Sequence, residues 1–220
     1  MAIPYGNQLT IFRNTGVNTL VKILFTLQYF IVVLVMLVSC ADNPTTHFHL
    51  LTSSKINALE KNKQLFSTKA IGIREIKLPA YLDRPQIVTR AGKNELVLSY
   101  LHQWAEALSQ SVPRVIVKDL QARIPTINVL SYPWSHTSNR DLEISIQINQ
   151  FEIVDQQRCV LDVDWWVFSS VNQLVHIDHS VMTVAINKKD YVSYVAAQSE
   201  ALEQFSSVLG VKILTILGNE

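Results

Sequence analysis

Residues 142–168 read LEISIQINQFEIVDQQRCVLDVDWWVF and contain two runs in which apolar and polar residues alternate. Successive side chains of a strand point to opposite faces of its sheet. The first alternating run therefore predicts a half-buried strand over residues 142–151, and the second predicts another over residues 159–168. A third extended run over residues 174–186 follows after a short turn. Three neighbouring strands with short connections predict an antiparallel meander.

Other extended runs and three helical patterns flank this region. The extended runs predict strands over residues 47–51, 68–78 and 128–132. A helix over residues 95–110 is predicted because apolar residues recur four, three and four positions apart, at Val97, Leu101, Trp104 and Leu108. Further helices are predicted over residues 115–124 and 190–217. The fold class expected is α+β, a mostly antiparallel sheet with helices packed on one face.

An apolar segment precedes the predicted domain. Residues 23–39 carry no charge, Arg13 and Lys22 lie before them, and the chain turns polar after Cys40. That order, positive then apolar then small, is the order of a secretory signal. Residues 37–40, Leu-Val-Ser-Cys, also resemble the cleavage pattern of bacterial lipoproteins, in which the cysteine thiol receives diacylglycerol and the new amine receives an acyl chain.

We therefore expect a signal peptide of the lipoprotein type over residues 1–39 and a lipidated tether over residues 40–46. Residues 47–220 would form a single α+β periplasmic domain. No cofactor is expected beyond the covalent diacylglycerol and N-acyl lipid on Cys40. The alternative is an uncleaved transmembrane anchor, because the apolar run approaches the roughly 20 residues that span a bilayer.

Composition argues against several classes of protein. The chain has 220 residues, a net charge of +1 and no polybasic run, so no nucleic-acid partner is expected. Its cysteines are Cys40 and Cys159. If Cys40 carries lipid, Cys159 is a lone thiol, which we interpret as a small buried side chain.

Few residues suggest catalysis or metal binding. Asp162 and Asp164 share a strand face, which we interpret as solvated or facing a partner rather than as an acid-base pair. His47 and His49 also share a face, but a third ligand would have to come from elsewhere in the chain. We therefore expect no catalytic residues, no metal site and no enzymatic activity.

The tryptophans are better candidates for contacts with a partner. Trp165 and Trp166 are adjacent, so a strand places one indole on each face of the sheet. One should lie in the core, and the other, beside Phe168, would form an exposed apolar patch of the kind found at interfaces. Trp134, in a polar loop, is either an anchor of that loop or a contact.

Residues 78–90 read LPAYLDRPQIVTR. This run resembles the signature of the PqiC-type lipoproteins, the auxiliary lipoprotein component of ABC-type transport systems. The segment WAEAL at residues 104–108, the paired strands and the closing helix are similar as well. The resemblance covers the chain from Cys40 onward.

The resemblance implies a non-enzymatic envelope protein on the periplasmic face of the outer membrane. It implies a partner with MCE domains, whose rings or tubes carry lipid between the membranes, and a homo-oligomeric ring of the chain itself. Ala41, rather than an aspartate, follows Cys40, which favours the outer membrane and leaves the inner membrane as the other location.

Two prolines fix the geometry of the signature loop, so that it can present side chains to a partner at low entropic cost. Alternatively, Asp83 and Arg84 pair merely to hold the loop. The residues expected at a partner interface are Tyr81, Asp83, Arg84, Gln86, Trp134 and Trp166.

Two other functions compete with the transport role. One is a structural or assembly lipoprotein of the envelope that takes no part in transport. The other is a lipid-anchored periplasmic enzyme, which would need a folded pocket that joins Asp162 or Asp164 to a histidine.

Overall fold

The structure is a computed structural model that describes residues 15–38, 44–53, 69–134 and 139–218. The chain forms two compact units, Met1–Pro44 and Thr45–Glu220. The first unit contains α1 (Thr15–Val38), a helix of 24 residues that includes residues 23–38 of the apolar run. At 1.5 Å per residue this helix is about 36 Å long. Cys40 lies outside the described residues.

The second unit is a sheet of eight strands with two helices. Its strands are β1 (His47–His49), β2 (Ala70–Ile73), β3 (Gln86–Ala91), β4 (Glu95–Trp104), β5 (Asn128–Ser131), β6 (Leu142–Val154), β7 (Arg158–Ser169) and β8 (Leu174–Ala185). The helices are α2 (Leu108–Arg123) and α3 (Tyr191–Gly218). The fold class is α+β, as expected, and the three strands of the meander form where the alternation of residues 142–186 predicts them.

The sheet is mixed rather than mostly antiparallel. Antiparallel pairing joins β3 to β4, β6 to β7 and β7 to β8. Parallel pairing joins β1 to β4, β2 to β5, β2 to β6 and β3 to β6. The long strand β6 is central, because β7 lies along one side while β2 and β3 follow each other along the other. The short strands pair with partners distant in sequence, and alternation alone does not indicate strand direction.

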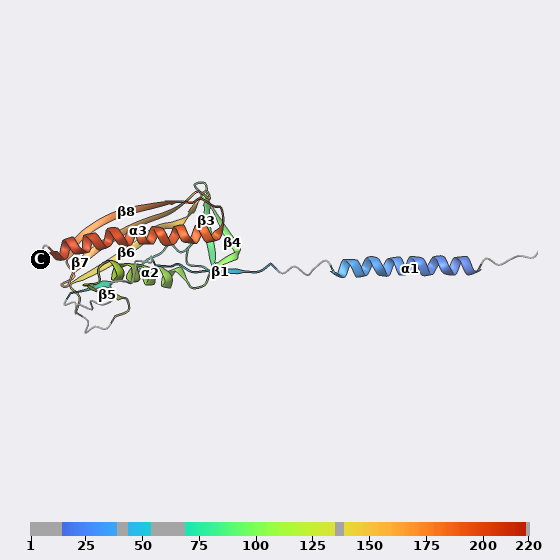
Figure 1. Ribbon diagram of the computed structural model, residues 1–220, viewed down its shortest axis with the longest axis horizontal. Coiled ribbons are helices and arrows are strands. Elements are labelled where there is room, and N and C mark those ends of the chain that lie inside the picture. Colours follow the sequence, from blue (N-terminus) through green and yellow to red (C-terminus); the bar gives the residue numbers. More distant parts are fainter. Residues whose placement is uncertain (1–14, 39–43, 54–68, 135–138, 219–220) are drawn as a thin grey trace, which may run out of the picture. The chain divides into compact units, whose positions relative to one another are not determined.

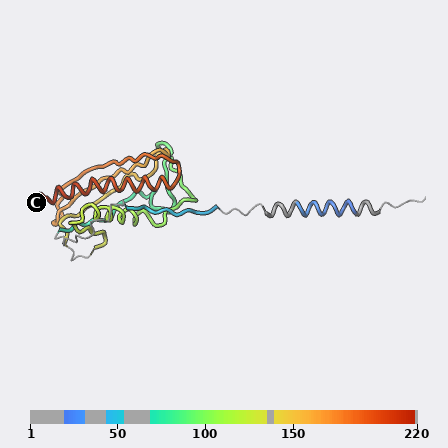
Figure 2. The backbone as a smooth tube through the Cα atoms, viewed as in Figure 1, coloured from blue at the N-terminus to red at the C-terminus, as the bar shows by residue number. Residues whose placement is uncertain are grey.

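The core lies between this sheet and α3. Figure 1 shows α3 running along β6, β7 and β8, and α2 packs beside it. The same arrangement appears in Figure 2, where the red C-terminal helix lies against the orange strands. Trp165, Phe151 and Phe205 are the largest fully buried side chains. These side chains from β7, β6 and α3 fix the helix on one face of the sheet.

Among the described residues, α3 is long and apolar enough to cross a membrane, by length and composition alone. The burial of its side chains distinguishes a core helix from a membrane-spanning one. Leu202, Phe205 and Leu209 are buried against the sheet and α2. We therefore interpret α3 as the core helix of this domain.

The helix predicted over residues 95–110 is wrong. Residues 95–104 form β4, which pairs with β3 in a hairpin, and α2 begins only at Leu108. The turn passes through Gly92 at a φ of 71°, a conformation that glycine adopts without strain. The inward residues are Leu96 and Leu98, whereas Val97 and Leu101 are 43% and 40% exposed. The apolar spacing therefore fits an extended strand whose two faces both carry apolar residues.

Other predicted bounds also shift. The strand expected over residues 68–78 is limited to β2, with a single bridge from Lys77 to Gln147 beyond it. The helix expected over residues 115–124 begins earlier, at Leu108, and Pro113 lies inside it without ending it. The residues expected to point inward from it, Ile116 and Leu120, are buried.

Candidate functional site

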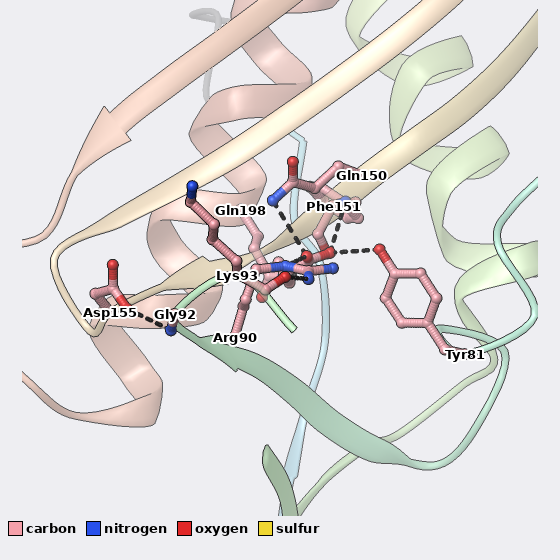
Figure 3. Close-up of polar contacts among 9 residues, drawn as sticks. Tyr81, Arg90, Gly92, Lys93, Gln150, Phe151, Asp155 and Gln198 are labelled. Atoms are coloured by element: carbon pink, nitrogen blue, oxygen red, sulfur yellow. Dashed lines mark hydrogen bonds and ion pairs between the residues drawn. The ribbon is translucent and has the colours of Figure 1, made fainter. Parts of the chain in front are cut away.

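A buried carboxylate lies beneath the signature loop. Glu152, on β6, is fully buried and accepts hydrogen bonds from four donors (Figure 3). Arg90 Nε lies 2.6 Å from Oε1, and the Tyr81 hydroxyl lies 2.8 Å from Oε2. The side-chain amide of Gln150 and the backbone N–H of Phe151 complete the set at 3.1 and 3.2 Å. Because every buried charge needs a partner, this arrangement satisfies Glu152.

This buried centre fixes the geometry of residues 81–90. Burial, followed by the hydrogen bond to Glu152, raises the pKa of Tyr81 to about 12. The hydrogen bond to Glu152 also raises the pKa of Arg90. Arg90 Nη1 also donates a hydrogen bond to the carbonyl oxygen of Lys93 at 2.9 Å, so the same side chain ties β3 to the hairpin turn. Tyr81 therefore lies with its hydroxyl turned inward, as an anchor of the loop.

The other signature residues are more accessible. Asp83 is exposed and accepts a hydrogen bond from Ser109 Oγ at 3.3 Å. Arg84 is half-buried, and its Nε has no hydrogen-bond partner in the described part of the chain. Gln86 is half-buried at the start of β3, opposite Gln103 of β4. Asp83 thus contacts α2, and the alternative in which it pairs with Arg84 is not seen among the ion pairs of the described residues.

Trp134 lies at the other edge of the sheet, against β2. The guanidinium of Arg140 lies 4.6 Å from the centre of its ring, and Tyr132 meets it edge-on at 5.6 Å. A Cβ at Gly72 would lie 2.6 Å from Arg140 Cδ and 3.1 Å from the indole. Glycine at position 72 therefore allows both side chains to lie close to the backbone of β2.

The adjacent tryptophans of β7 separate as predicted. Trp165 is fully buried, whereas Trp166 is half-buried on the opposite face of the sheet. On that face Trp166 lies opposite Ser145 of β6 and Ile177 of β8, and Ile177 is 60% exposed. Phe168 lies one row away, with the Arg74 guanidinium 4.3 Å from its ring centre. We call this surface of β6, β7 and β8, opposite α3, the open face.

Two exposed valines and one exposed isoleucine extend the apolar part of the open face. They are Val175, Ile177 and Val181, all on β8. Within the described residues β8 pairs only with β7, so its other edge offers unpaired backbone groups. Its sequence contains neither proline nor lysine, residues that commonly protect an edge from pairing. The open face and this edge are therefore continuous, and both are available to a partner.

A polar cluster occupies the middle of the open face. Asn149 donates to Asp164 at 2.7 Å and to Asp162 at 3.1 Å, and His179 Nδ1 lies 2.9 Å from Asp164. The hydrogen bond from Asn149, with that from His179, lowers the pKa of Asp164, while the hydrogen bond to Asp164 raises the pKa of His179. The side chains of His179 and Asp164 are 54% and 36% exposed. The cluster thus joins a histidine to an aspartate on solvated surface, without the enclosure that a catalytic site needs.

A separate cluster contains three histidines. His47 and His49 of β1 lie beside His102 of β4, the non-local neighbour that sequence reasoning could not supply. No group of three or more potential ligands among the described residues has a geometry that could hold a metal ion. Cys159 is buried, and burial raises the pKa of its thiol, so it lies in the core as expected.

Sequence reasoning missed Glu152, Arg90 and His102. The available signal for Glu152 was its position within the alternating run of β6, where a charged residue falls between apolar Phe151 and Ile153. Arg90 lies at the end of the signature run, but it was not among the residues expected at the interface.

Together, these elements define an α+β domain that follows an apolar N-terminal helix in the sequence. The chain belongs to the family described as ABC-type transport auxiliary lipoprotein component, whose model matches residues 51–209. This confirms the resemblance found in the sequence. Membership implies a membrane-anchored location in the cell envelope and an association with an ABC-type transport system, and the family is not a known enzyme family.

Two solved structures share the fold. One, described only as an uncharacterized protein, is 17% identical with a TM-score of 0.65, and the match covers 77% of this chain and 99% of that one. The other, from Xanthomonas campestris and assigned to a family of unknown function, is 14% identical with a TM-score of 0.58, covering 76% of this chain and 92% of that one. No curated protein matches the chain. At these identities the similarity shows the fold alone.

Proposed function

We propose that this chain is an outer-membrane lipoprotein of the periplasmic face that docks an MCE-domain protein of an ABC-type lipid-transport system. The family match over residues 51–209 is the observation that carries the proposal. The domain supports it by presenting an extended apolar and aromatic face that its own helices leave uncovered. Exposed apolar patches on soluble domains mark interaction sites.

The proposed docking surface is the open face around Trp166. A central aromatic residue with apolar neighbours is the usual composition of an interface hot spot, and Asp162, Asp164 and His179 would add polar contacts beside Trp166. The loop that carries Asp83, Arg84 and Gln86 is a second proposed contact, because Tyr81 and Glu152 hold its backbone in place. The Arg140 guanidinium lies over the ring of Trp134, so we propose that Trp134 anchors its own loop.

We also propose that copies of the chain assemble into a ring. The unprotected edge of β8 supports this proposal, because an exposed edge strand readily accepts another strand. In such an assembly the open faces of neighbouring copies would be presented together to a ring-shaped partner.

Removal of the aromatic centre should abolish docking without unfolding the domain. We expect Trp166→Ser, combined with Ile177→Ser, to weaken capture of the MCE protein by about tenfold or more, since hot-spot residues contribute about 2 kcal/mol or more. The measurement is co-purification of the MCE protein from membranes, with the melting temperature of each variant as the test of folding.

Tyr100→Ser is the matched control, because Tyr100 is 73% exposed on β4, outside the open face. It should leave capture unchanged. Equal capture by the wild type and by the Trp166 double variant would reject the open face as the docking surface. Failure of the wild type to capture any MCE protein would favour a structural lipoprotein without a transport role.

The lipid anchor is tested by mass. We expect the protein extracted from membranes to have the mass of residues 40–220 plus about three acyl chains, because each buried methylene contributes about 0.8 kcal/mol and several chains are needed for stable anchoring. Cys40→Ala should lose both the lipid and the cleavage. If the wild type keeps the residues before Cys40, α1 is a transmembrane anchor and the domain belongs to the inner membrane.

A further inference from the structure

Three histidines meet where the folded domain begins. His49 Nε2 and His102 Nδ1 lie 3.0 Å apart, so one ring donates a hydrogen bond and the other accepts it. His47 stacks on His102 with ring centres 5.2 Å apart. On its other side His102 stacks on Tyr191, the first residue of α3, at 4.0 Å. The cluster of His47, His49 and His102 therefore connects β1 to β4 and to α3.

The attachment of β1 depends strongly on this cluster. β1 has three residues and pairs only with β4 among the described strands. Beyond the ladder, the N–H of Ala105 donates to the carbonyl oxygen of His49 at 2.8 Å. Phe48, between the two histidines, is 64% exposed and adds little packing. The next firmly buried residue is Leu51, so the chain from Thr45 to Leu50 has few other contacts to hold it.

The groups around the cluster favour uncharged imidazoles. Burial lowers the pKa of His49, and so does the charge of His102 and of His47. Burial and the charge of His47 also lower the pKa of His102. α3 contributes Tyr191, which contacts the rings of His49 and His102, and Tyr194, which meets Tyr191 edge-on at 5.3 Å.

No carboxylate compensates the cluster within the described part of the chain. Asp190, which precedes Tyr191, accepts the N–H of Ser193 at 2.7 Å, and it is not among the groups that shift the pKa of His49 or His102. Added protons would therefore place like charges in contact.

We propose that these three histidines form an acid-sensitive latch, which holds β1 on β4 while the imidazoles are neutral and releases it when they take up protons. The direction follows from linkage. The lowered pKa values of His49 and His102 mean that these two rings bind protons less well while β1 is attached than after it detaches, when they titrate near the ordinary value of 6.5. Attachment is therefore complete above that pH and weakens as the pH falls below it.

Release would change the reach of the domain from its anchor. The four residues His47 to Leu50 would join the tether, and at about 3.3–3.6 Å per residue they would extend it by about 13–14 Å. This consequence rests on the proposed membrane anchorage, whereas the latch itself does not. A longer tether at acid pH would let the docking surface search further from the membrane.

Hydrogen exchange of the full-length protein in detergent tests the latch. Amide protection of peptides spanning β1 is measured by mass spectrometry at about pH 7.5 and about pH 5.5, and corrected for intrinsic exchange rates. We expect the protection of β1 to fall several-fold at the lower pH, because each imidazole whose pKa is lowered in the attached state binds its proton more tightly in the detached state. Peptides from β6 and β7 should keep their protection.

Substitutions assign the effect to the cluster. His102→Gln retains an amide that can hydrogen-bond and should reduce the pH dependence, while His179→Gln, a histidine on the open face, should leave it unchanged. If His102→Gln detaches β1 at both pH values, His47→Gln, which preserves the bond between His49 and His102, should reduce the dependence instead. Undiminished protection of wild-type β1 at the lower pH overturns the latch, as does a wild-type dependence that persists in both variants. Neither result depends on lipid or partner binding.

Discussion

Trp165→Ala is expected to lower the free energy of unfolding by about 3–5 kcal/mol, the usual cost of truncating a fully buried aromatic side chain. The indole is completely buried, and its N–H donates to Ser180 Oγ at 3.1 Å. It meets Phe205 of α3 edge-on at 6.4 Å, so the cavity would open between the sheet and the helix that covers it. Urea unfolding of the detergent-solubilised protein, followed by circular dichroism, measures the change.

The neighbouring residue provides the control. Trp166→Ala removes the same side chain from the open face of the same strand, where the indole is half-buried, and it should cost about 1 kcal/mol or less. The two adjacent variants thus differ in the face that they affect. Equal losses of stability would mean that the open face is packed in the free protein, and would count against its availability to a partner.

Arg90→Ala should be the second strongly destabilising change, by about 3–5 kcal/mol, because it leaves the buried Glu152 without its cation. The Glu152 side chain has 0% exposure, against 23% for Arg90, so water cannot replace the lost partner. Tyr81, Gln150 and the backbone of Phe151 still donate to the carboxylate, which favours the lower end of that range. Thermal and urea unfolding give the magnitude.

Arg114→Ala serves as the comparison. Arg114 pairs with Glu106 at the surface with 41% of its side chain exposed, and such pairs contribute about 1 kcal/mol or less. Glu152→Gln in the Arg90→Ala background should recover part of the lost stability, because it removes the unpaired charge. A loss of about 1 kcal/mol or less for Arg90→Ala would show that Glu152 reaches solvent or is protonated.

The elements predicted correctly from the sequence are those in which apolar residues recur with a clear strand or helix period. In β6 and β7 polar and apolar residues alternate so regularly that the buried face is fixed, and with it the separation of Trp165 from Trp166. In α3 a 28-residue segment without proline keeps a helical stripe that includes Leu202, Phe205 and Leu209. The observed bounds of these elements agree closely with the predicted ones, because tertiary packing keeps the structure that their local sequence favours.

The hairpin of β3 and β4 was missed for a specific reason. Val97, Leu101 and Trp104 fit a helical stripe, but Leu96 and Leu98 fit a strand equally well. The turn at Gly92 between two extended runs was the better guide, since such turns join antiparallel strands. The pairing of residues 95–98 with β3 shows that the strand period, rather than the helical one, applies here.

The contacts that matter most at the candidate site join distant parts of the chain. Tyr81 lies 71 residues from Glu152, and His49 lies 53 residues from His102. No local period indicates such pairs, because they arise only when parallel pairing brings β3 beside β6 and β1 beside β4. The signature run was recognisable in the sequence, whereas the buried carboxylate that anchors it was not.

The position of α3 after all the strands that it covers has a consequence for when this domain folds. Residues 191–218 supply the cover for the inner faces of β6 and β7, and they are the last of the described elements to be synthesised. Until they emerge, Trp165 and its neighbours lack the helix that covers them, and the strands remain without a complete core. The nascent domain is therefore expected to stay unfolded and dependent on chaperones until α3 has been synthesised. That delay would suit the export through a translocation channel that the proposed periplasmic location requires.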